Sequence, residues 1–338
     1  MLLIITNSAD IHPNPVIQKL NDRKIPVFRF NTDRLLTDYD ISFFLSNDGY
    51  KFRIKYKVYP FELTSEEISC VWERRPMEPE ATYDDINNEI IKNTVLNEAN
   101  GFIRFLRYAL VGMDVLWIGH PINERLAGSK ILQKMIAQRI GFTIPETIFS
   151  NKISDVNFFG NQLIALKPIC SFDIPADEEN SIVFYTQKVT GQQLLELGEK
   201  SFRNTINFLE QYIEKDYELR VTMIHGEVFC AKVCSQQQKE TEGAIDWRQG
   251  YDHGLRFEAI NIPEELKSKC IQFLNSFNLQ FGCFDFIKHG STYIFLECNT
   301  NGQWLWLEEE TGLPISDCLA QLFTRCHEEH KKMQKTTI

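Results

Sequence analysis

A predicted β-hairpin near the C-terminus constrains this chain more than any other feature. Two apolar runs, residues 281–287 and 293–299, flank a glycine-containing turn. Side chains two apart on a strand share a face, so Glu297 and Asn299 point the same way. A turn centred between the runs places Asp285 opposite Glu297. Two carboxylates and an amide predict a Mg²⁺ site, because this ion prefers hard oxygen ligands. The alternative is a hairpin with a solvated polar face.

Two lysines are candidates for binding phosphate. Lys130 opens a segment, residues 131–140, whose apolar side chains follow the period of a helix, and helix N-termini favour anions. Lys167 follows an apolar strand over residues 163–166. Taken singly, each of the two is better explained as an ordinary surface lysine.

Two arginines are candidates for handling a phosphate or carboxylate. Arg220 lies on the first strand of another predicted hairpin, with Thr222 on the same face. Arg248 follows Asp246 in a loop rich in Gly and Gln. The guanidinium fork matches the geometry of both anions. A salt bridge from Arg220 to a nearby glutamate is the alternative.

The order of elements predicts a mixed α/β (α+β) chain of more than one lobe. A strand–helix–strand pattern opens the sequence, antiparallel strands follow around residues 47–49, and residues 84–112 have helical character. The 338 residues exceed a single typical core. We expect an N-terminal α/β domain over residues 1–119, a central lobe over 120–205 and a C-terminal lobe over 206–338.

Composition restricts the functional class. The net charge of −10 disfavours binding to nucleic acid, whose phosphates an acidic protein repels. No apolar stretch is long enough to predict a membrane span, and the N-terminal apolar run is too short for a signal peptide. Nine cysteines without a C-x-x-C pair predict reduced thiols and a cytoplasmic location.

The order of these segments resembles the ATP-grasp superfamily, and within it the maturases of ribosomal peptides of the microviridin (graspetide) type. The resemblance covers nearly the whole chain and rests on the joint order of its motifs. The matching segments are Trp72-Glu73-Arg74-Arg75-Pro76, Ala127-Gly128-Ser129-Lys130, residues 141–147, Lys167, residues 210–215 and 218–222, Ser235-Gln236, Asp246-Trp247-Arg248, residues 281–285 and residues 295–304.

The resemblance implies that ATP lies between two antiparallel sheets. Phosphate and purine contacts would come from Lys130 and Lys167, and ribose contacts from Glu218. A hinge would read adenine through its backbone, at Glu210, Gln211, Tyr212 and Ile213. Mg²⁺ would bind Asp285, Glu297 and Asn299, while Arg220, Arg248 and Lys167 would serve catalysis.

The family also implies the reaction and the partners. A side-chain carboxylate of a precursor peptide, with leader and acidic core, would be phosphorylated by ATP. A hydroxyl or amine of the same peptide would then close an ester or amide ring. The resemblance further implies a homodimer. One departure is that residues 169–174 after Lys167 lack the glycine-rich loop of many ATP-grasp enzymes, and another is Gln211 at the hinge.

Three residues are candidates for contacting the substrate. Arg74, Arg75 and Asp246 are candidates, with both arginines facing substrate carboxylates across the cleft; pairing of the arginines with Glu73 or Glu78 is the alternative. Two other functions remain open: a small-molecule or protein-tail ligase of the glutathione-synthetase or RimK-like kind, and a non-catalytic ATP-binding module. The complete set of ligand residues argues against the module.

Overall fold

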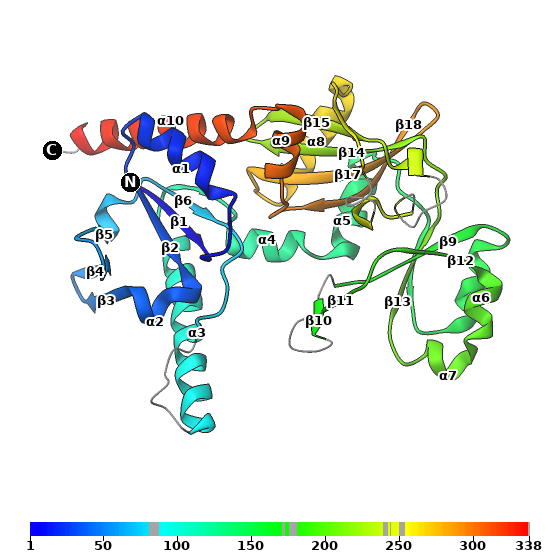
Figure 1. Cartoon of the computed structure of the whole chain (residues 1–338), viewed down its shortest axis with the longest axis horizontal. Helices are drawn as coiled ribbons and strands as arrows, with labels where there is room; N and C mark the ends of the chain where they lie inside the picture. The colour runs from blue at the N-terminus through cyan, green and yellow to red at the C-terminus, as the bar shows by residue number, and fades with distance from the viewer. Residues whose placement is uncertain are drawn as a thin grey trace.

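The computed structural model describes residues 1–80, 88–170, 173–175, 181–238, 243, 245–249 and 254–336. Three bodies follow one another along the chain (Figure 1). The N-terminal domain stands at one end, the helical segment α4 (Pro121–Ala127) leads away from it, and two antiparallel sheets form the rest. The mixed α/β class predicted from the sequence is confirmed.

A parallel four-stranded sheet forms the centre of the N-terminal domain. All five residues of β1 (Leu2–Thr6) are buried, as expected for a strand covered on both faces. The helix α10 (Ile315–Thr336) from the C-terminus packs against α1, so the two chain ends lie at the same side of the molecule (Figure 1). The strand order is β2 (Val27–Asn31), β1, β6 (Cys70–Glu73), β7 (Leu116–Ile118), with α1 (Pro13–Asp22) between β1 and β2.

A smaller antiparallel sheet and a long helix complete this domain. The predicted turn at residues 47–49 joins β3 (Tyr39–Ser46) to β4 (Gly49–Tyr56), and β5 (Glu62–Thr64) pairs with β4. The short helix α2 (Leu35–Asp38) precedes β3. The helix α3 (Glu89–Val111) begins within the predicted helical stretch, of which residues 84–87 lie outside the described residues.

The helix predicted after residue 129 is α5 (Lys130–Ile140), and its ends have clear local causes. The Ser129 hydroxyl accepts a hydrogen bond from the Leu132 N–H, which caps the N-terminus. Gly141 ends the helix in the left-handed conformation, with φ of 90°. The helix packs on α8 (Glu264–Ser276) and on β18, and this packing holds Lys130 beside the predicted hairpin.

One antiparallel sheet forms the first wall of the future site. Its core of apolar side chains includes Val156, Leu194 and Phe202, under the short helices α6 (Gly191–Glu196) and α7 (Gly198–Phe202). The expected lobe boundary at residue 206 lies directly before β13, so this sheet spans that boundary. The strand order is β12 (Gln187–Thr190), β9 (Leu163–Lys167), β13 (Asn207–Gln211), β8 (Thr147–Ser150). A separate two-stranded sheet joins β10 (Asp173–Pro175) to β11 (Ser181–Val183).

The second antiparallel sheet forms the opposite wall and contains both predicted hairpins. Asp285 pairs with Glu297 across β17 and β18, so the predicted register is confirmed. Arg220 on β14 lies directly opposite Asp285. The strand order is β16 (Phe257–Ala259), β15 (Glu227–Val233), β14 (Tyr217–Ile224), β17 (Phe281–His289), β18 (Thr292–Asn299), followed by α9 (Leu305–Thr311).

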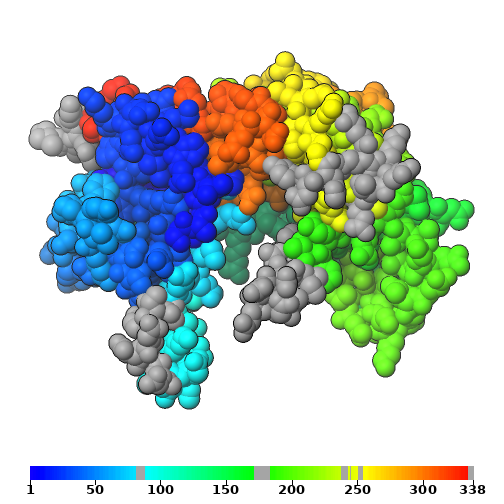
Figure 2. All heavy atoms as spheres, viewed as in Figure 1, coloured from blue at the N-terminus to red at the C-terminus, as the bar shows by residue number. Residues whose placement is uncertain are grey.

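The space-filling view shows how the bodies are arranged around an open side (Figure 2). The N-terminal domain and the four-stranded sheet with α6 and α7 stand apart, with α9 and its surroundings between them. Within the described part of the chain, no helix is both long and apolar enough to cross a membrane.

Candidate active site

A cavity of about 960 Å³ lies between the two antiparallel sheets. The four-stranded sheet contributes the end of β9 and β13, and the five-stranded sheet contributes β14, β17 and β18. The loop after β18 closes one side. All of the predicted nucleotide, metal and catalytic residues line it: Lys130, Lys167, Glu210, Gln211, Tyr212, Ile213, Glu218, Arg220, Arg248, Asp285, Glu297 and Asn299, together with Arg75 and Asp246.

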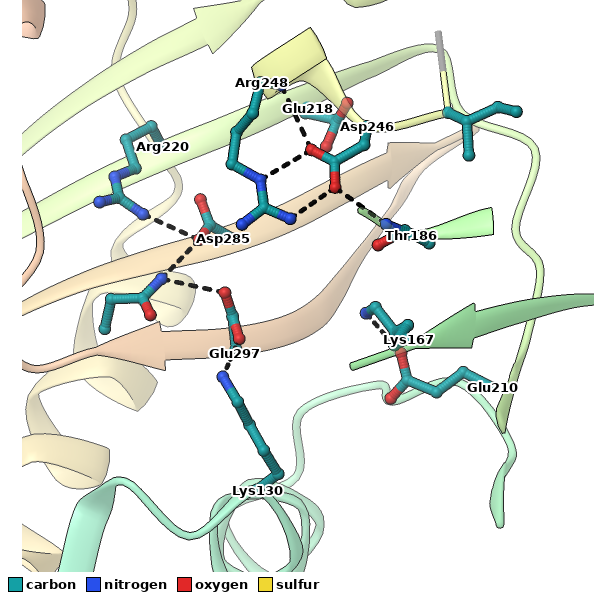
Figure 3. A network of polar contacts seen from close by, with 12 residues as sticks. Lys130, Lys167, Thr186, Glu210, Glu218, Arg220, Asp246, Arg248, Asp285 and Glu297 are labelled. Atoms are coloured by element: carbon teal, nitrogen blue, oxygen red, sulfur yellow. Dashed lines mark hydrogen bonds and ion pairs between the residues drawn. The ribbon is translucent and has the colours of Figure 1, made fainter. Parts of the chain in front are cut away.

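On the five-stranded wall, the two hairpin carboxylates belong to one polar network (Figure 3). The Asn299 amide nitrogen donates to Asp285 and to Glu297, at 3.0 Å each. Arg220 Nη1 lies 2.8 Å from the Asp285 carboxylate. The Lys130 ammonium, from the first turn of α5, forms an ion pair with Glu297. The helix and the hairpin, far apart in sequence, therefore meet at these carboxylates.

The pKa values of the two carboxylates are shifted in opposite directions. Burial raises the pKa of Asp285, and the nearby Glu297 charge adds to this, so Arg220 offsets only part of the cost. Burial also opposes ionisation of Glu297, but the Lys130 and Lys167 ammoniums outweigh it and hold the pKa of Glu297 well below its usual range. Glu297 is thus the firmly ionised member of the pair.

The hairpin donors fit a divalent cation only in part as they stand. Among the described residues, no group of three or more His, Cys, Asp or Glu side chains could hold a metal ion. Asp285, Glu297 and Asn299 offer two carboxylates and one amide, a set that leaves room for phosphate oxygens and water around Mg²⁺. The Asn299 nitrogen faces both carboxylates, so the amide must turn for its oxygen to join.

On the four-stranded wall, one buried acid holds two lysines. Glu210 on β13 is 1% exposed, and its carboxylate lies 2.7 Å from Lys167 Nζ and 2.6 Å from Lys134 Nζ. Burial lowers the pKa of Lys134 to about 8, although Glu210 raises it again in part. For Lys167 the attraction of Glu210 outweighs burial and raises the pKa. This triad carries one net positive charge beneath the cavity.

Lys134 was not among the residues selected from the sequence. It lies one helical turn after Lys130, so an i, i+4 lysine pair on one helix face was the available signal. Lys134 also donates to the Phe295 carbonyl at 3.4 Å, and its side chain is buried. The side chain therefore reaches Glu210 from behind the wall.

The predicted adenine hinge leaves fewer backbone donors than expected. The Gln211 N–H already donates to the Glu146 carbonyl and the Tyr212 N–H to the Leu163 carbonyl, both at 2.8 Å. A base at this edge is therefore left with carbonyl groups and Ile213 as candidate contacts. Glu218 also lines the cavity, and its carboxylate lies 2.7 Å from Lys215 Nζ. Its contact with ribose stays a prediction.

Asp246 and Arg248, which both line the cavity, form a local ion pair (Figure 3). Arg248 Nε donates to Asp246 at 2.8 Å, and the Thr186 N–H donates to the same carboxylate at 3.3 Å. The guanidinium lies 5.6 Å from the centre of the Tyr185 ring. The pair therefore joins the loop around residue 246 to the strand end of the opposite lobe.

The two adjacent arginines of the N-terminal domain differ from the expectation that both face the cleft. Arg75 is exposed and lines the cavity, with a backbone φ of 47°. Arg74 is 1% exposed, and its Nε lies 3.0 Å from the Asp10 carboxylate. The expected substrate contact of Arg74 is therefore corrected, because burial and Asp10 hold it away from the cavity. Pairing with Glu73 is also wrong, since Glu73 binds Arg107.

Two protein-family models match this chain. A model of the MvdD pre-ATP grasp domain matches residues 1–120, and a model of the RimK-like ATP-grasp domain matches residues 130–323. No curated protein matches the sequence.

Several solved structures share the fold over the whole chain. A RiPP-associated ATP-grasp ligase of Chryseobacterium gregarium, in complex with ADP and a leader and core peptide, is 25% identical, with 95% of each chain covered and a TM-score of 0.85. Macrocyclase MdnC of Microcystis aeruginosa, bound with precursor peptide MdnA, is 24% identical, covering 96% of this chain and 99% of that one, with a TM-score of 0.80. The ligase PsnB, complexed with minimal precursor, Mg and ADP, is 16% identical, covering 96% and 97%, with a TM-score of 0.72.

The RimK-like model alone spans more than half of the chain, and the cavity between two antiparallel sheets is the nucleotide site that this fold implies. The MvdD-type domain in front of it agrees with the resemblance seen in the sequence. The chain therefore belongs to the RimK-like ATP-grasp family, carries an MvdD-type pre-ATP-grasp domain in front of it, and is an ATP-dependent ligase.

Proposed function

We propose that the enzyme cross-links the side chains of a ribosomally made precursor peptide, using ATP and Mg²⁺. The observation that carries the proposal is a cavity with a cationic wall facing a carboxylate wall, under a pre-ATP-grasp domain of the MvdD type. The similar ligase of C. gregarium holds ADP together with a leader and core peptide.

The paired charges of the site suit the transfer of a phosphoryl group to a carboxylate. Both partners are anionic, so the site must supply positive charge and fixed orientation. We assign phosphate contacts to Lys130 and Lys167 and charge neutralisation at the reacting carboxylate to Arg220. Mg²⁺ held by Asp285, Glu297 and Asn299 would supply further neutralisation. Lys130 forms an ion pair with Glu297. If Mg²⁺ bound that carboxylate, the Lys130 ammonium would be released to contact phosphate.

The proposed reaction has two balanced steps. An Asp or Glu side-chain oxygen of the peptide attacks the γ-phosphorus of ATP, and the bond to the β–γ bridging oxygen breaks to release ADP. A Thr or Ser hydroxyl, or a Lys amine, of the same peptide then attacks the acyl carbon. Phosphate leaves, the nucleophile loses its proton, and an ester or amide ring is closed.

Three accompanying assignments rest on the same proposal. Arg75, which is exposed and lines the cavity, is assigned to binding a substrate carboxylate. Arg248 is assigned to catalysis beside Arg220, and its partner Asp246 to substrate binding. A cytoplasmic location fits the ATP requirement and nine free cysteines. Assembly as a homodimer stays a prediction.

Intact peptide mass tests the proposal. The protein is incubated with ATP, Mg²⁺ and the acidic precursor peptide encoded nearest to its gene, with ATP omitted in a parallel reaction. We expect loss of one water per ring only when ATP is present, with one ADP formed per ring. Arg75→Gln should weaken processing, while Arg34→Gln, which removes a partly exposed ion pair with Glu80 on the same domain, should not.

The other outcomes separate the competing functions. An unchanged peptide, with ATP consumed only when a free amino acid is added, identifies a small-molecule ligase. Addition of amino acids to a polypeptide end, rather than loss of water, identifies a tail ligase. Binding of ATP without consumption under any of these conditions contradicts the enzyme assignment.

A further inference from the structure

A buried group in the N-terminal domain grips the loop that closes the active-site cavity. Asp10, in the loop between β1 and α1, forms an ion pair with Arg74 Nε at 3.0 Å and contacts His12 Nδ1 at 3.1 Å. Arg74 Nη1 donates to the Gly302 carbonyl at 3.1 Å, and the Trp304 N–H donates to His12 Nε2 at 3.3 Å. One carboxylate thus orients two side chains that hold two points of a single loop.

The same loop is held from the other side by a residue of the reaction site. Arg220 Nη2 donates to the Gln303 carbonyl at 3.2 Å while its Nη1 binds Asp285. Three consecutive loop residues, Gly302 to Trp304, are therefore each bound by a side chain, with Arg220 in the middle. A shift of this loop moves the carbonyl that orients Arg220.

Packing leaves the loop little freedom to adjust. A Cβ at Gly302 would lie 2.8 Å from Arg220 Nη2 and 2.6 Å from the Cβ of Cys283, so only glycine permits this approach. Arg74, Asp10 and His12 are all buried, and Arg74 Nη2 has no partner among the described residues. A buried ion pair with an unpaired donor contributes little to the free energy of folding. Its main effect here is to fix the positions of the groups that it contacts.

We propose that Asp10, acting through Arg74 and His12, forms a positioning unit that holds residues 302–304 and thereby fixes Arg220 against Asp285. The unit couples the N-terminal domain to phosphoryl transfer, and its catalytic part rests on the function proposed above. Arg74 does not touch the substrate. It acts on the rate because a displacement of about 1 Å at a transferring group can cost about 100-fold.

The test compares Arg74→Met and Arg74→Lys with the matched control Arg23→Met. Arg23 also joins the N-terminal domain to the C-terminal body, through Asp317 at 2.7 Å, but it is the residue that caps the C-terminus of α1, and within the described part of the chain its hydrogen bonds and ion pairs do not involve residues 302–304. Ring formation is followed by peptide mass, Mg-ADP affinity by calorimetry, and loop mobility by hydrogen exchange of a fragment covering residues 299–308.

We expect Arg74→Met to lower kcat about 30-fold or more, with the peptide KM and the ADP affinity changed less than threefold. Exchange within residues 299–308 should rise at least tenfold. Arg74→Lys should recover part of both effects, since an ammonium can reach one of the two partners. Arg23→Met should match the wild type in kcat and in exchange of this fragment.

Two results overturn the proposal: wild-type kcat in Arg74→Met, or exchange at residues 299–308 equal to that of Arg23→Met. If Arg74→Met does not fold, Arg74→Lys decides by the same two readouts. If the wild type itself leaves the peptide unchanged, the proposed function fails separately. The exchange of the loop then still supports or overturns the positioning unit.

Discussion

The buried charges on the two walls of the cavity are paired in different ways. On the five-stranded sheet, two carboxylates are each matched by a cation, Asp285 by Arg220 and Glu297 by Lys130. On the four-stranded sheet, Glu210 alone is shared by Lys134 and Lys167. The first wall is balanced and the second has an excess positive charge. This difference is the reason for our proposal that Mg²⁺ binds at the first wall and that the ATP phosphates contact the second.

The largest expected effect comes from removing the ionised carboxylate of the balanced wall. Glu297→Gln keeps the shape but leaves Lys130 without its partner and the metal with one charge fewer. We expect ring formation to fall about 1,000-fold, as on removal of a major electrostatic contact. Mg-ADP affinity should fall with it. Exposed Glu309→Gln on α9 is the control, and peptide mass is the measurement.

If Glu297→Gln keeps more than a tenth of the wild-type rate, the assignment of metal binding to this wall is wrong. Loss of ADP affinity in the absence of Mg²⁺ as well would show that the residue acts on the fold of the site instead. Circular dichroism of both variants separates that case.

The second effect should fall on nucleotide binding. Lys167→Met removes the cation at the end of β9 and leaves Glu210 with Lys134 as its remaining lysine partner. We expect kcat/KM for ATP to fall about 100-fold, with the peptide KM changed little. Lys200→Met, an exposed lysine on α7 in the same lobe, should be neutral. Equal losses in the two variants would contradict a specific phosphate role.

These first two predictions rest on residues that the sequence itself revealed. The hairpin could be predicted because strand periodicity and a glycine turn fix which side chains share a face. The same two features predicted the pairing of its two carboxylates. Lys134 was missed because its partner Glu210 lies on a strand about 75 residues away by sequence number. Arg74 and Arg75 are neighbours, and only the tertiary structure shows that one turns inward to Asp10 while the other faces the cavity.

The shared acid of the cationic wall should matter most for stability. Glu210→Gln leaves two lysines without a buried counter-charge, so we expect the free energy of unfolding to fall by about 3 kcal/mol. Urea unfolding measures this. Adding Lys134→Met should recover part of the loss, because one of the two uncompensated charges is gone. A double variant less stable than Glu210→Gln alone would show that Lys134 does not depend on Glu210.

The smallest effect is a pH dependence confined to the cationic wall. The pKa of Lys134 is about 8, so its charge is lost as the pH rises from 7 to 9, while Glu297 stays ionised. We expect ADP binding without Mg²⁺ to weaken a few-fold over this range. The folded state loses this proton before the unfolded chain does, so the Lys134 contribution to stability rises above pH 8. Lys134→Met should remove both trends, as calorimetry and urea unfolding at each pH can show.

The step on which the proposed function depends is the conversion of a peptide carboxylate to an acyl phosphate within this cavity. Hydroxylamine added to the complete reaction intercepts such an intermediate, because it attacks the acyl carbon before the peptide's own nucleophile does. We expect a hydroxamate on an Asp or Glu side chain of the peptide, formed only with ATP and Mg²⁺, and absent in Glu297→Gln. ADP release by the wild type with neither hydroxamate nor ring, or ring closure without ATP, would contradict it.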